Sequence, residues 1–458
     1  MKRYYYVLLV LIAGFILCYL GFFNNYPLMH SDSGTYIKSG FLNQVPPDRP
    51  IFYGLFVRHI SMAESLYFVI ITQGILLALL FLYYFRYFLP DKNPVIPFLG
   101  FIFLITFFTG ASLNVSQVIP DIFTPITILG LGLLFLVNNL KVRDLVIISI
   151  LVFLGIAVHN SHLLIAAGLL IISTFLYAFR KIRTKWTFLS WRRLAYLWLL
   201  LIGTNLVIST VNFAFGSEFK SSRGGHVFLM SRLIDTGILK QYLDDKCGEV
   251  DYKFCEYKDQ IPWDFIWDFE NSPLYKTGGW EGNEEEYKKI IFDALTTPKY
   301  LKIFIIKGLE SSFNQFFTFE TGNAKQMLKG SAPYSVIDRF FKDQLKEYVG
   351  SRQSRKVFNF NVINTSQLFL FAFSLFVIIV ILILRFPLKW KILAGFFLVS
   401  VYMNALVCGA FSFVAPRYQS RVVWLLILPV FMILTEYRQF MGSILNRKDN
   451  QQSSDQEE

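Results

Sequence analysis

The chain has 458 residues, of which 54% are hydrophobic and 18% aromatic, and its mean hydropathy is +0.46. Runs of about twenty apolar residues recur between charged clusters, which excludes a soluble globular domain and is typical of a polytopic membrane protein. The formal net charge of +12 comes mainly from basic clusters in short loops, so we interpret it as a signal of topology and of contact with membrane lipids, with no nucleic-acid partner.

Ten apolar segments are long enough to cross a bilayer, which predicts an all-α polytopic membrane protein of about ten transmembrane helices. The first follows Lys2-Arg3, is too long for a signal-peptide core and precedes no small-x-small cleavage site, so we expect a retained span. A few residues separate the fifth and sixth, which predicts a tight hairpin. The expected spans are 4–23, 64–89, 95–113, 120–138, 145–159, 162–179, 194–213, 366–384, 392–412 and 419–436.

The loop after the first expected span, 24–63, gives the strongest local signal. A carboxylate just outside a helix end, partly shielded from water, can take a proton from an attacking hydroxyl, which makes Asp32 a candidate catalytic base. The same residue type is equally suited to cap a short helix beginning near Ser33, and the sequence leaves both interpretations open. Tyr36 and Arg49 are candidates for positioning a substrate.

Two further polar groups lie at the ends of expected spans. Asp121 begins the fourth, where a carboxylate complements the helix dipole and is also placed to orient an acceptor. Together with Asp32 it makes only two carboxylates, too few to indicate a divalent cation. His159 and His162 share a helical face, but no Cys, Asp or Glu follows nearby to complete a metal site; contact with phosphate, acid–base work and simple packing all remain open for them. We therefore predict no metal and no cofactor.

The segment 214–365 is an expected extramembrane domain of mostly helical structure. Two of its residues, Cys247 and Cys255, are close enough in sequence to form a disulfide on an oxidising face, and their spacing does not suggest zinc. Capping and periodicity predict helices over Val227–Leu243, from near Gly282, and over Pro298–Phe317.

Three tryptophans, Trp263, Trp267 and Trp280, stand out in this segment. They could pack the small domain together or enter the membrane interface. Asp264 and Asp268 interleave with them and carboxylates avoid anionic lipid, so we expect packing.

The last three expected spans occupy 366–436, and a polar tail follows at 437–458. Before the final span, Arg417 and Arg421 are four residues apart and would share a helical face. Arginine forks match phosphate oxygens, so this pair predicts a phosphate-binding site, although basic residues at helix ends also serve as membrane anchors.

Orientation follows from the basic residues of the short loops. One set of loops contains eighteen Lys and Arg residues and the other contains five, which predicts that both termini are cytoplasmic. The expected organisation is a seven-span region at 1–213 with its catalytic loop outside, an outer domain at 214–365, a three-span region at 366–436 and a cytoplasmic tail. A bacterial inner membrane is the expected location, and a eukaryotic lumenal face fits the same pattern.

The first outer loop resembles that of the C-type (GT-C) glycosyltransferases, multi-span enzymes that take a sugar from a polyprenyl-phosphate carrier and have an acidic catalytic residue in this loop. The resembling residues are Asp32 with Tyr36, and the stretch Arg49–Phe56. The resemblance implies that 33–60 forms short helices along the membrane. It also implies a polyprenyl-phosphate-linked sugar donor and a lipid, glycan or protein acceptor. Several family members have two adjacent acidic residues where Asp32 is flanked by serines, and 214–365 is more similar to poorly characterised bacterial membrane proteins.

These observations predict a membrane glycosyltransferase in which Asp32 is the base while Arg417 and Arg421 hold the carrier phosphate. The alternatives are a non-catalytic scaffold for envelope assembly and a transporter of lipid or glycan. Transporters usually have ionisable residues near the midplane, and the expected spans have almost none, with Asn205 and Asn404 as polar exceptions.

Overall fold

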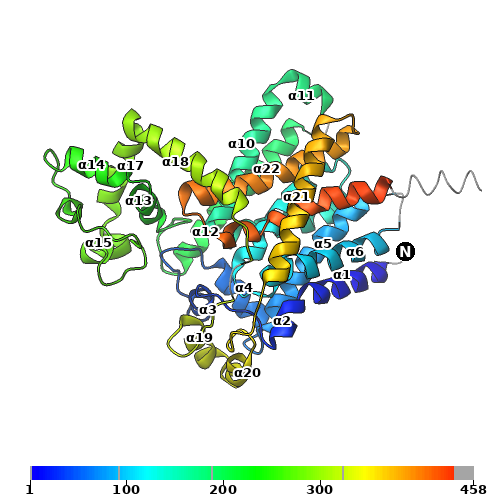
Figure 1. Cartoon of the computed structure of the whole chain (residues 1–458), viewed down its shortest axis with the longest axis horizontal. Coiled ribbons are helices and arrows are strands. Elements are labelled where there is room, and N and C mark those ends of the chain that lie inside the picture. Colours follow the sequence, from blue (N-terminus) through cyan, green and yellow to red (C-terminus); the bar gives the residue numbers. More distant parts are fainter. Residues whose placement is uncertain (1–2, 91–92, 187–188, 322–323, 438–458) are drawn as a thin grey trace, which may run out of the picture.

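The computed structural model describes residues 3–90, 93–186, 189–321 and 324–437. The described residues form helices and turns with no β-strand, so the predicted all-α class is confirmed for them (Figure 1). Of the predicted tail, only Tyr437 is described. Five cations of the loop-charge count also lie outside the described residues: Lys2, Lys92, Arg438, Arg447 and Lys448.

The N-terminal half alternates long apolar helices with short ones. Its first elements are α1 (Arg3–Leu17), α2 (Tyr19–Asn24), α3 (Ser33–Leu42), α4 (Phe52–Ser61), α5 (Tyr67–Phe88), α6 (Val95–Phe108) and α7 (Ala111–Ser116). They are followed by η1 (Pro120–Ile122), α8 (Phe123–Leu136), α9 (Val142–Ala157), α10 (Asn160–Ala178), α11 (Arg180–Lys185) and α12 (Trp191–Ala214).

Shorter helices fill the middle segment before the last long ones. The middle elements are α13 (Gly225–Asp235), α14 (Ile238–Lys246), η2 (Lys253–Tyr257), α15 (Pro273–Lys276), α16 (Gly279–Gly282), α17 (Glu284–Thr296), α18 (Pro298–Phe317), α19 (Ala332–Phe340), η3 (Lys342–Gln344) and α20 (Leu345–Gly350). The last are α21 (Asn361–Ile383), α22 (Leu388–Phe411), α23 (Pro416–Ser420) and η4 (Val423–Leu426).

Six of the described helices are long and apolar enough to cross a membrane, so the chain is a multi-pass membrane protein. They are α5, α10, α12, α21, α22 and the helical segment Pro416–Tyr437. The other four predicted spans contain α1, α6, η1 with α8, and α9, all shorter than the six. Helix α1 is interrupted at Cys18, and α6 ends where Thr109 adopts an extended conformation.

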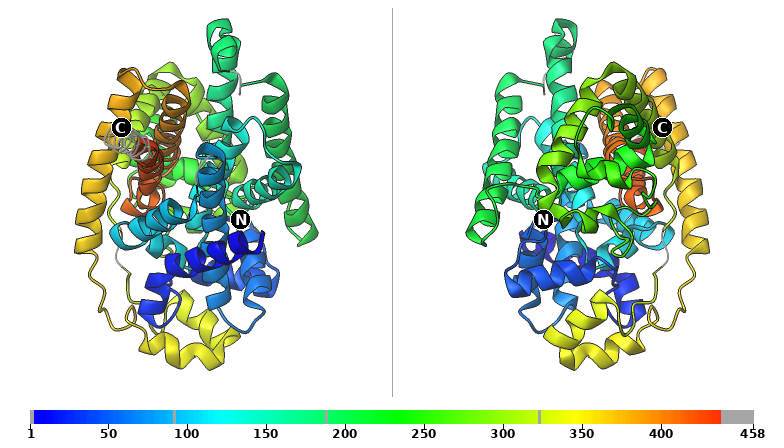
Figure 2. Two further views of the ribbon diagram at one scale, coloured as in Figure 1. Left: turned by 90° about the vertical axis from the view of Figure 1, so that its right-hand side faces the viewer. Right: turned by 90° about the vertical axis from the view of Figure 1, so that its left-hand side faces the viewer.

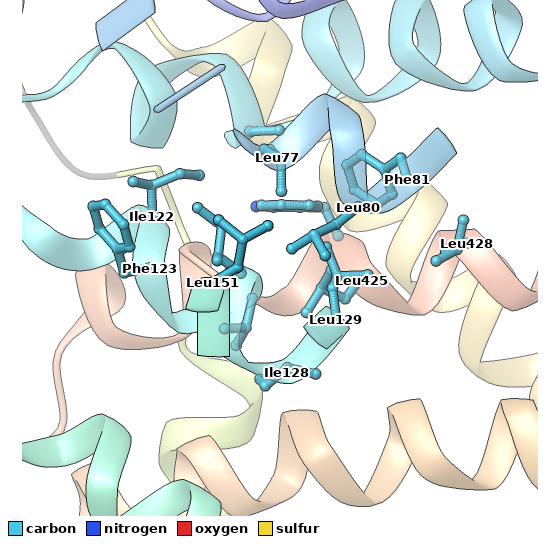
Figure 3. Close-up of a cluster of buried hydrophobic side chains, with 14 of the residues drawn as sticks. Leu77, Leu80, Phe81, Ile122, Phe123, Ile128, Leu129, Leu151, Leu425 and Leu428 are labelled. Atoms are coloured by element: carbon cyan, nitrogen blue, oxygen red, sulfur yellow. The ribbon is translucent and has the colours of Figure 1, made fainter. Parts of the chain in front are cut away.

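The central apolar core is built around α5 (Figure 3). Leu77 and Phe81 of α5 are buried together with Leu129 of α8, Leu151 of α9 and Leu425 of the last helical segment. Close packing of this kind leaves little freedom at the helix ends. The loops that leave these helices therefore start from fixed positions.

The first part of the middle segment has a small core of its own. Val227 and Met230 of α13 pack with Leu239 of α14 and with Tyr287 and Ile290 of α17. The predicted continuous helix over 227–243 is interrupted, because Gly237 has φ +72° and separates α13 from α14. In this part Cys247 and Cys255 form a disulfide.

The second part of the middle segment packs elsewhere. Helix α19 lies against α3, and its Val336 and Ile337 join the central core. Both views of Figure 2 place this part beyond the N-terminal helices, away from α13 and α17 (Figure 2). The segment 214–365 thus has two parts that contact different faces of the helical bundle.

The expected packing of the three tryptophans is wrong for two of them. Trp263 is 89% exposed and Trp267 45% exposed. Phe265 and Ile266 between them turn inward and fill the small core, which leaves the flanking indoles on the surface. Only Trp280 packs against that core.

Helix α18 has the predicted span Pro298–Phe317 and connects the small core to the bundle. It lies along α22 at Gly409, where an added Cβ would collide with the backbone of Ser311. Its opposite side exposes an apolar stripe of residues four apart. The stripe consists of Leu301, Ile305, Leu309, Phe313 and Phe317.

Candidate functional site

Two short helices in the first loop bring its polar residues together. Helices α3 and α4 cross so closely at Gly40 and Gly54 that a Cβ on either residue would collide with the backbone of the other helix. Only glycine allows this approach. Because Asp32 precedes α3 and Arg49 precedes α4, the crossing holds both side chains at one end of the helix pair.

Asp32 does not cap α3. Its side chain makes no hydrogen bond to the first turn of the helix, and it is 26% exposed. The turn is held instead by the Ser33 hydroxyl, which accepts a hydrogen bond from His30 N at 2.9 Å. The carboxylate of Asp32 is therefore left to interact with groups from other parts of the chain.

The side chain of Arg417 joins Asp32 to Asp121. Its Nη1 donates to Oδ2 of Asp32 at 2.6 Å, while its Nε and Nη2 donate to Oδ2 and Oδ1 of Asp121 at 2.5 and 3.2 Å. The three residues lie at the start of α3, in η1 and in α23. Since Arg417 is 23% exposed, the bridge lies at the edge of the bundle and is open to its surroundings.

Beneath this bridge lies a buried pair. Asp121 and Arg421 are each 1% exposed, and Nη1 of Arg421 donates to Oδ1 of Asp121 at 3.2 Å. Nη2 of Arg421 also contacts Oδ1 of Asn404 at 3.0 Å and Sγ of Cys408 at 3.3 Å. Asp121 is thus the counter-ion of both Arg417 and Arg421, and it makes no helix-capping hydrogen bond.

Arg49 approaches Asp32 from the other side. Its Nη2 lies 3.5 Å from Oδ1 of Asp32, and its Nε donates to Asp48 at 2.7 Å. Its guanidinium lies 4.6 Å from the ring centre of buried Tyr36, a cation–π contact. The predicted residues Tyr36 and Arg49 are therefore in contact with each other beside the candidate base.

The charges around Asp32 determine its protonation. Burial would raise the pKa of Asp32, but the hydrogen bond with His30 and the positive charges of Arg417 and Arg49 hold that pKa well below its usual range. Asp32 is therefore ionised at neutral pH. It is also a weak base for as long as Arg417 holds it.

The two predicted histidines have different surroundings. His162 is fully buried, with Nδ1 2.6 Å from Gly155 O and Nε2 2.6 Å from the Thr124 hydroxyl, so both nitrogens are engaged within the helix packing. His159 is partly exposed and caps α10, its Nδ1 accepting from Ser161 N at 3.2 Å. Only His159 presents a ring that a substrate could reach.

Two buried glutamines fix the loops that carry Asp32 and Arg417. Gln353 accepts from Met29 N at 2.9 Å and donates to Met29 O at 2.7 Å. Gln315 makes the same pair of bonds with Ala415, both at 2.8 Å. Each amide holds the backbone of one residue, three positions before Asp32 and two before Arg417.

We expect Gln353→Leu to lower the stability of the protein, because both backbone groups of Met29 would lose their partner while remaining buried, at about 1–3 kcal/mol for each group. Thermal unfolding of the detergent-purified protein measures this. The control is Gln344→Leu, whose amide bonds Glu64 O at an exposed position and whose loss should cost no more than about 0.5 kcal/mol. Equal melting temperatures for the two variants would show that the bonds from Gln353 to Met29 do not stabilise this loop.

Sequence reasoning did not identify two members of this site, Gln315 and Gln353. The amides of Gln315 and Gln353 carry no local signal, since glutamine is common and their partners are distant in the chain. Asn404 did have one, as a polar residue inside an apolar segment, and it proves to hold Arg421. His30 had one as well, because it lies two residues before Asp32 in the same short turn.

Among the described residues, no three His, Cys, Asp or Glu side chains lie close enough together to hold a metal ion. A scan against protein-family models, a search of curated proteins and a search of solved structures each found no match. The function must therefore be inferred from the chemistry of the site.

Proposed function

We propose that this protein is a membrane glycosyltransferase that moves a sugar from a polyprenyl-phosphate-type lipid donor to an acceptor on the outer face of the membrane. The observation that carries the proposal is the bridge from Asp32 through Arg417 to Asp121. It brings a carboxylate that can accept a proton into direct contact with a guanidinium that can bind phosphate. Both Asp32 and Arg417 are partly exposed, so a substrate can reach them.

Arg417 provides the link between donor binding and base activation. A phosphate oxygen of the donor competes with Asp32 for Nη1 of Arg417, while Asp121 keeps its hold on Nε and Nη2. Once Nη1 of Arg417 bonds the phosphate, Asp32 loses one of the contacts that lower its pKa, while those with His30 and Arg49 remain. The donor thus prepares the base for the acceptor.

The transfer itself needs no further group. Asp32 takes the proton of the acceptor hydroxyl as the hydroxyl oxygen bonds to the anomeric carbon of the sugar. The bond from that carbon to the phosphate oxygen breaks, and the electron pair leaves with the phosphate. Arg417 stabilises the charge that develops there, and the proposal requires no cofactor or metal.

The geometry separates the roles of the two arginines. Arg421 is almost fully buried under Asp121, whereas Arg417 is partly exposed. We therefore assign phosphate contact to Arg417 and assign to Arg421 the role of holding Asp121. Arg49, stacked on Tyr36 beside Asp32, is the second group placed to meet an anionic donor.

The proposed topology has ten crossings with both termini in the cytoplasm, in a bacterial inner membrane. The shorter helices α1, α6, α8 and α9 complete the set of spans, and their loops and breaks supply the missing length. In Figure 1 the N-terminus lies on the side opposite α13–α17, and α11 also lies away from them. This arrangement is in keeping with a cytoplasmic face that contains the N-terminus and α11 and an outer face that contains α13–α17. Proposed domains are the spans of 1–213 with the loop 24–63, the outer segment 214–365 and the spans of 366–436.

Cysteine labelling tests this orientation. A cysteine replacing Ser222 should react with an impermeant maleimide added from outside, and one replacing Thr184 in α11 should not, because these residues lie on opposite faces in the proposed topology. The native background is low, since Cys18 and Cys408 are buried and the other two cysteines are bonded. The reverse labelling pattern would overturn the placement of the site.

The proposal is tested in cells by analysis of lipids. Mass spectrometry of an extract from cells lacking the protein should reveal an accumulated polyprenyl-linked sugar and an acceptor without that sugar. The two alternatives, an envelope scaffold and a transporter, predict no such pair. A catalytically dead protein also separates them, because a scaffold would still function with Asp32→Asn.

A further inference from the structure

A groove of about 270 Å³ opens beside the loop that carries the site. It is lined by Pro47, Arg223, Gly278, Trp280 and Glu281. Pro47 lies two residues before Arg49. The loop and the outer segment also meet through Arg223, whose Nη1 lies 3.5 Å from Val45 O. A molecule in this groove would therefore lie next to the proposed catalytic loop.

Aromatic rings form one side of this groove. Trp280 packs against Gly224 so closely that a Cβ there would collide with the indole, and its ring lies 5.8 Å from that of Phe228. Trp267 lies 6.5 Å from Trp280 between ring centres and is 45% exposed. The indole of Trp280, which lines the groove, is thus in contact with the more accessible indole of Trp267.

Charged groups form the other side. Arg223 and Glu281 are an ion pair, and the carboxylate of Glu281 is 68% exposed. Within the described part of the chain, Nε of Arg223 has no hydrogen-bond partner although it is buried. The groove therefore offers an accessible acceptor next to an aromatic face, and Arg223 in its lining has a donor without a hydrogen-bond partner among the described residues.

We infer that this groove binds the saccharide part of the acceptor. A sugar ring has an apolar face of C–H groups that stacks on indole and a rim of hydroxyls that both donate and accept hydrogen bonds. Trp267 and Trp280 supply the stacking face, Glu281 accepts from a hydroxyl and Nε of Arg223 donates to a sugar oxygen. The role of the bound saccharide as the acceptor rests on the proposed function, whereas the binding of a saccharide does not.

The charges favour a sugar over a membrane surface. Asp264, Asp268 and Glu281 each follow one of the three tryptophans in the chain, and carboxylates are repelled by anionic lipid headgroups. A larger pocket of about 420 Å³ also has Arg223 in its lining. Its cations Lys220 and Lys288 are both paired with Glu284, so that pocket is the weaker candidate for a polar ligand.

The test is saturation-transfer NMR on the full-length protein in detergent, titrated with maltotriose and with the trisaccharide of N-acetylglucosamine. At least one of them should bind wild type. Trp267→Ala and Glu281→Gln should each weaken that binding by roughly three- to tenfold, the effect of losing one stacking or hydrogen-bonding partner. Both residues are exposed enough for the variants to fold normally.

Trp263→Ala is the matched control, because Trp263 is 89% exposed on the same loop and, unlike Trp267, has no ring contact with Trp280 among the described residues. It should leave sugar binding unchanged. Failure of both trisaccharides to bind, or equal binding by wild type and Trp267→Ala, would overturn the proposal. So would quenching by brominated lipid that disappears in Trp267→Phe, since it would place this indole in the membrane.

The Asp32→Asn protein distinguishes this inference from the proposed function. It should bind the trisaccharide as wild type does and yet transfer no sugar. Normal transfer by Asp32→Asn would remove the catalytic proposal and leave the saccharide site standing. If wild type transferred sugar normally but bound neither trisaccharide, the saccharide site would be overturned and the catalytic proposal would stand.

Discussion

The Asp32→Asn protein is expected to lose sugar transfer by about 10²-fold or more, which is the usual contribution of a catalytic base. Asparagine keeps the size of the side chain but cannot accept the proton of the acceptor hydroxyl. The fall should appear in turnover at saturating donor, because the base acts in the chemical step. Transfer of labelled sugar by purified protein in lipid nanodiscs measures it.

Asp338→Asn is the matched control. Asp338 is an exposed carboxylate on α19, the helix that packs against α3, and it has no contact with Arg417. Its loss should leave turnover unchanged. Arg417 remains held by Asp121 when Asp32 is replaced, so the fold of the variant should survive. Normal turnover by a well-folded Asp32→Asn protein would exclude Asp32 from the mechanism.

The helices of this protein could be predicted from the sequence because their signal is local. Each of the ten apolar segments contains a helix, and Pro298 marks the start of α18. The breaks were harder to predict. Gly237 adopts a left-handed conformation that divides an apparently continuous helix. A single residue of this kind does not change the hydrophobic periodicity, so the break could not be predicted from it.

The members of the site could be predicted, but not their contacts. Asp32, Asp121 and Arg417 stand out as polar residues at the ends of apolar segments. Their pairing joins positions up to 385 residues apart and depends on how the helices pack, which periodicity does not specify. The same limit applies to His162, whose two nitrogens are occupied by Gly155 and Thr124 only because three helices meet there.

The exposure of Trp263 shows why the sequence does not predict which apolar residues lie on the surface. Tryptophan is usually buried, and the interleaved carboxylates excluded only one of the alternatives that the sequence allowed. Trp263 is exposed because the neighbouring residues Phe265 and Ile266 fill the small core. Which of several neighbouring apolar residues fills a core is decided by three-dimensional fit and cannot be derived from composition.

The bridging role of Arg417 predicts a specific dependence on pH. In the free protein the hydrogen bond with His30 and the charges of Arg417 and Arg49 hold the pKa of Asp32 well below its usual range, so Asp32 stays ionised even in mild acid. When the donor phosphate takes Arg417, that pKa rises toward its usual range. The acid limb of kcat, which reports the loaded enzyme, should therefore lie at higher pH than the acid limb of kcat/KM for the donor, which reports the free enzyme.

Replacing Arg417 should remove this separation. In Arg417→Gln the free protein lacks one of the charges that lower the pKa of Asp32, so the acid limb of kcat/KM should move to higher pH and approach that of kcat. Arg417→Lys keeps a charge but loses the planar fork, and should raise the KM for the donor by roughly 10- to 100-fold, the loss of one charge-assisted hydrogen bond. Arg58→Gln is the control, since Arg58 lies in the same loop region but its side chain bonds Gly40 and Asn43 and no other described residue. Identical pH profiles for wild type and Arg417→Gln would show that Arg417 does not control the base, and the link between donor binding and base activation would then fail.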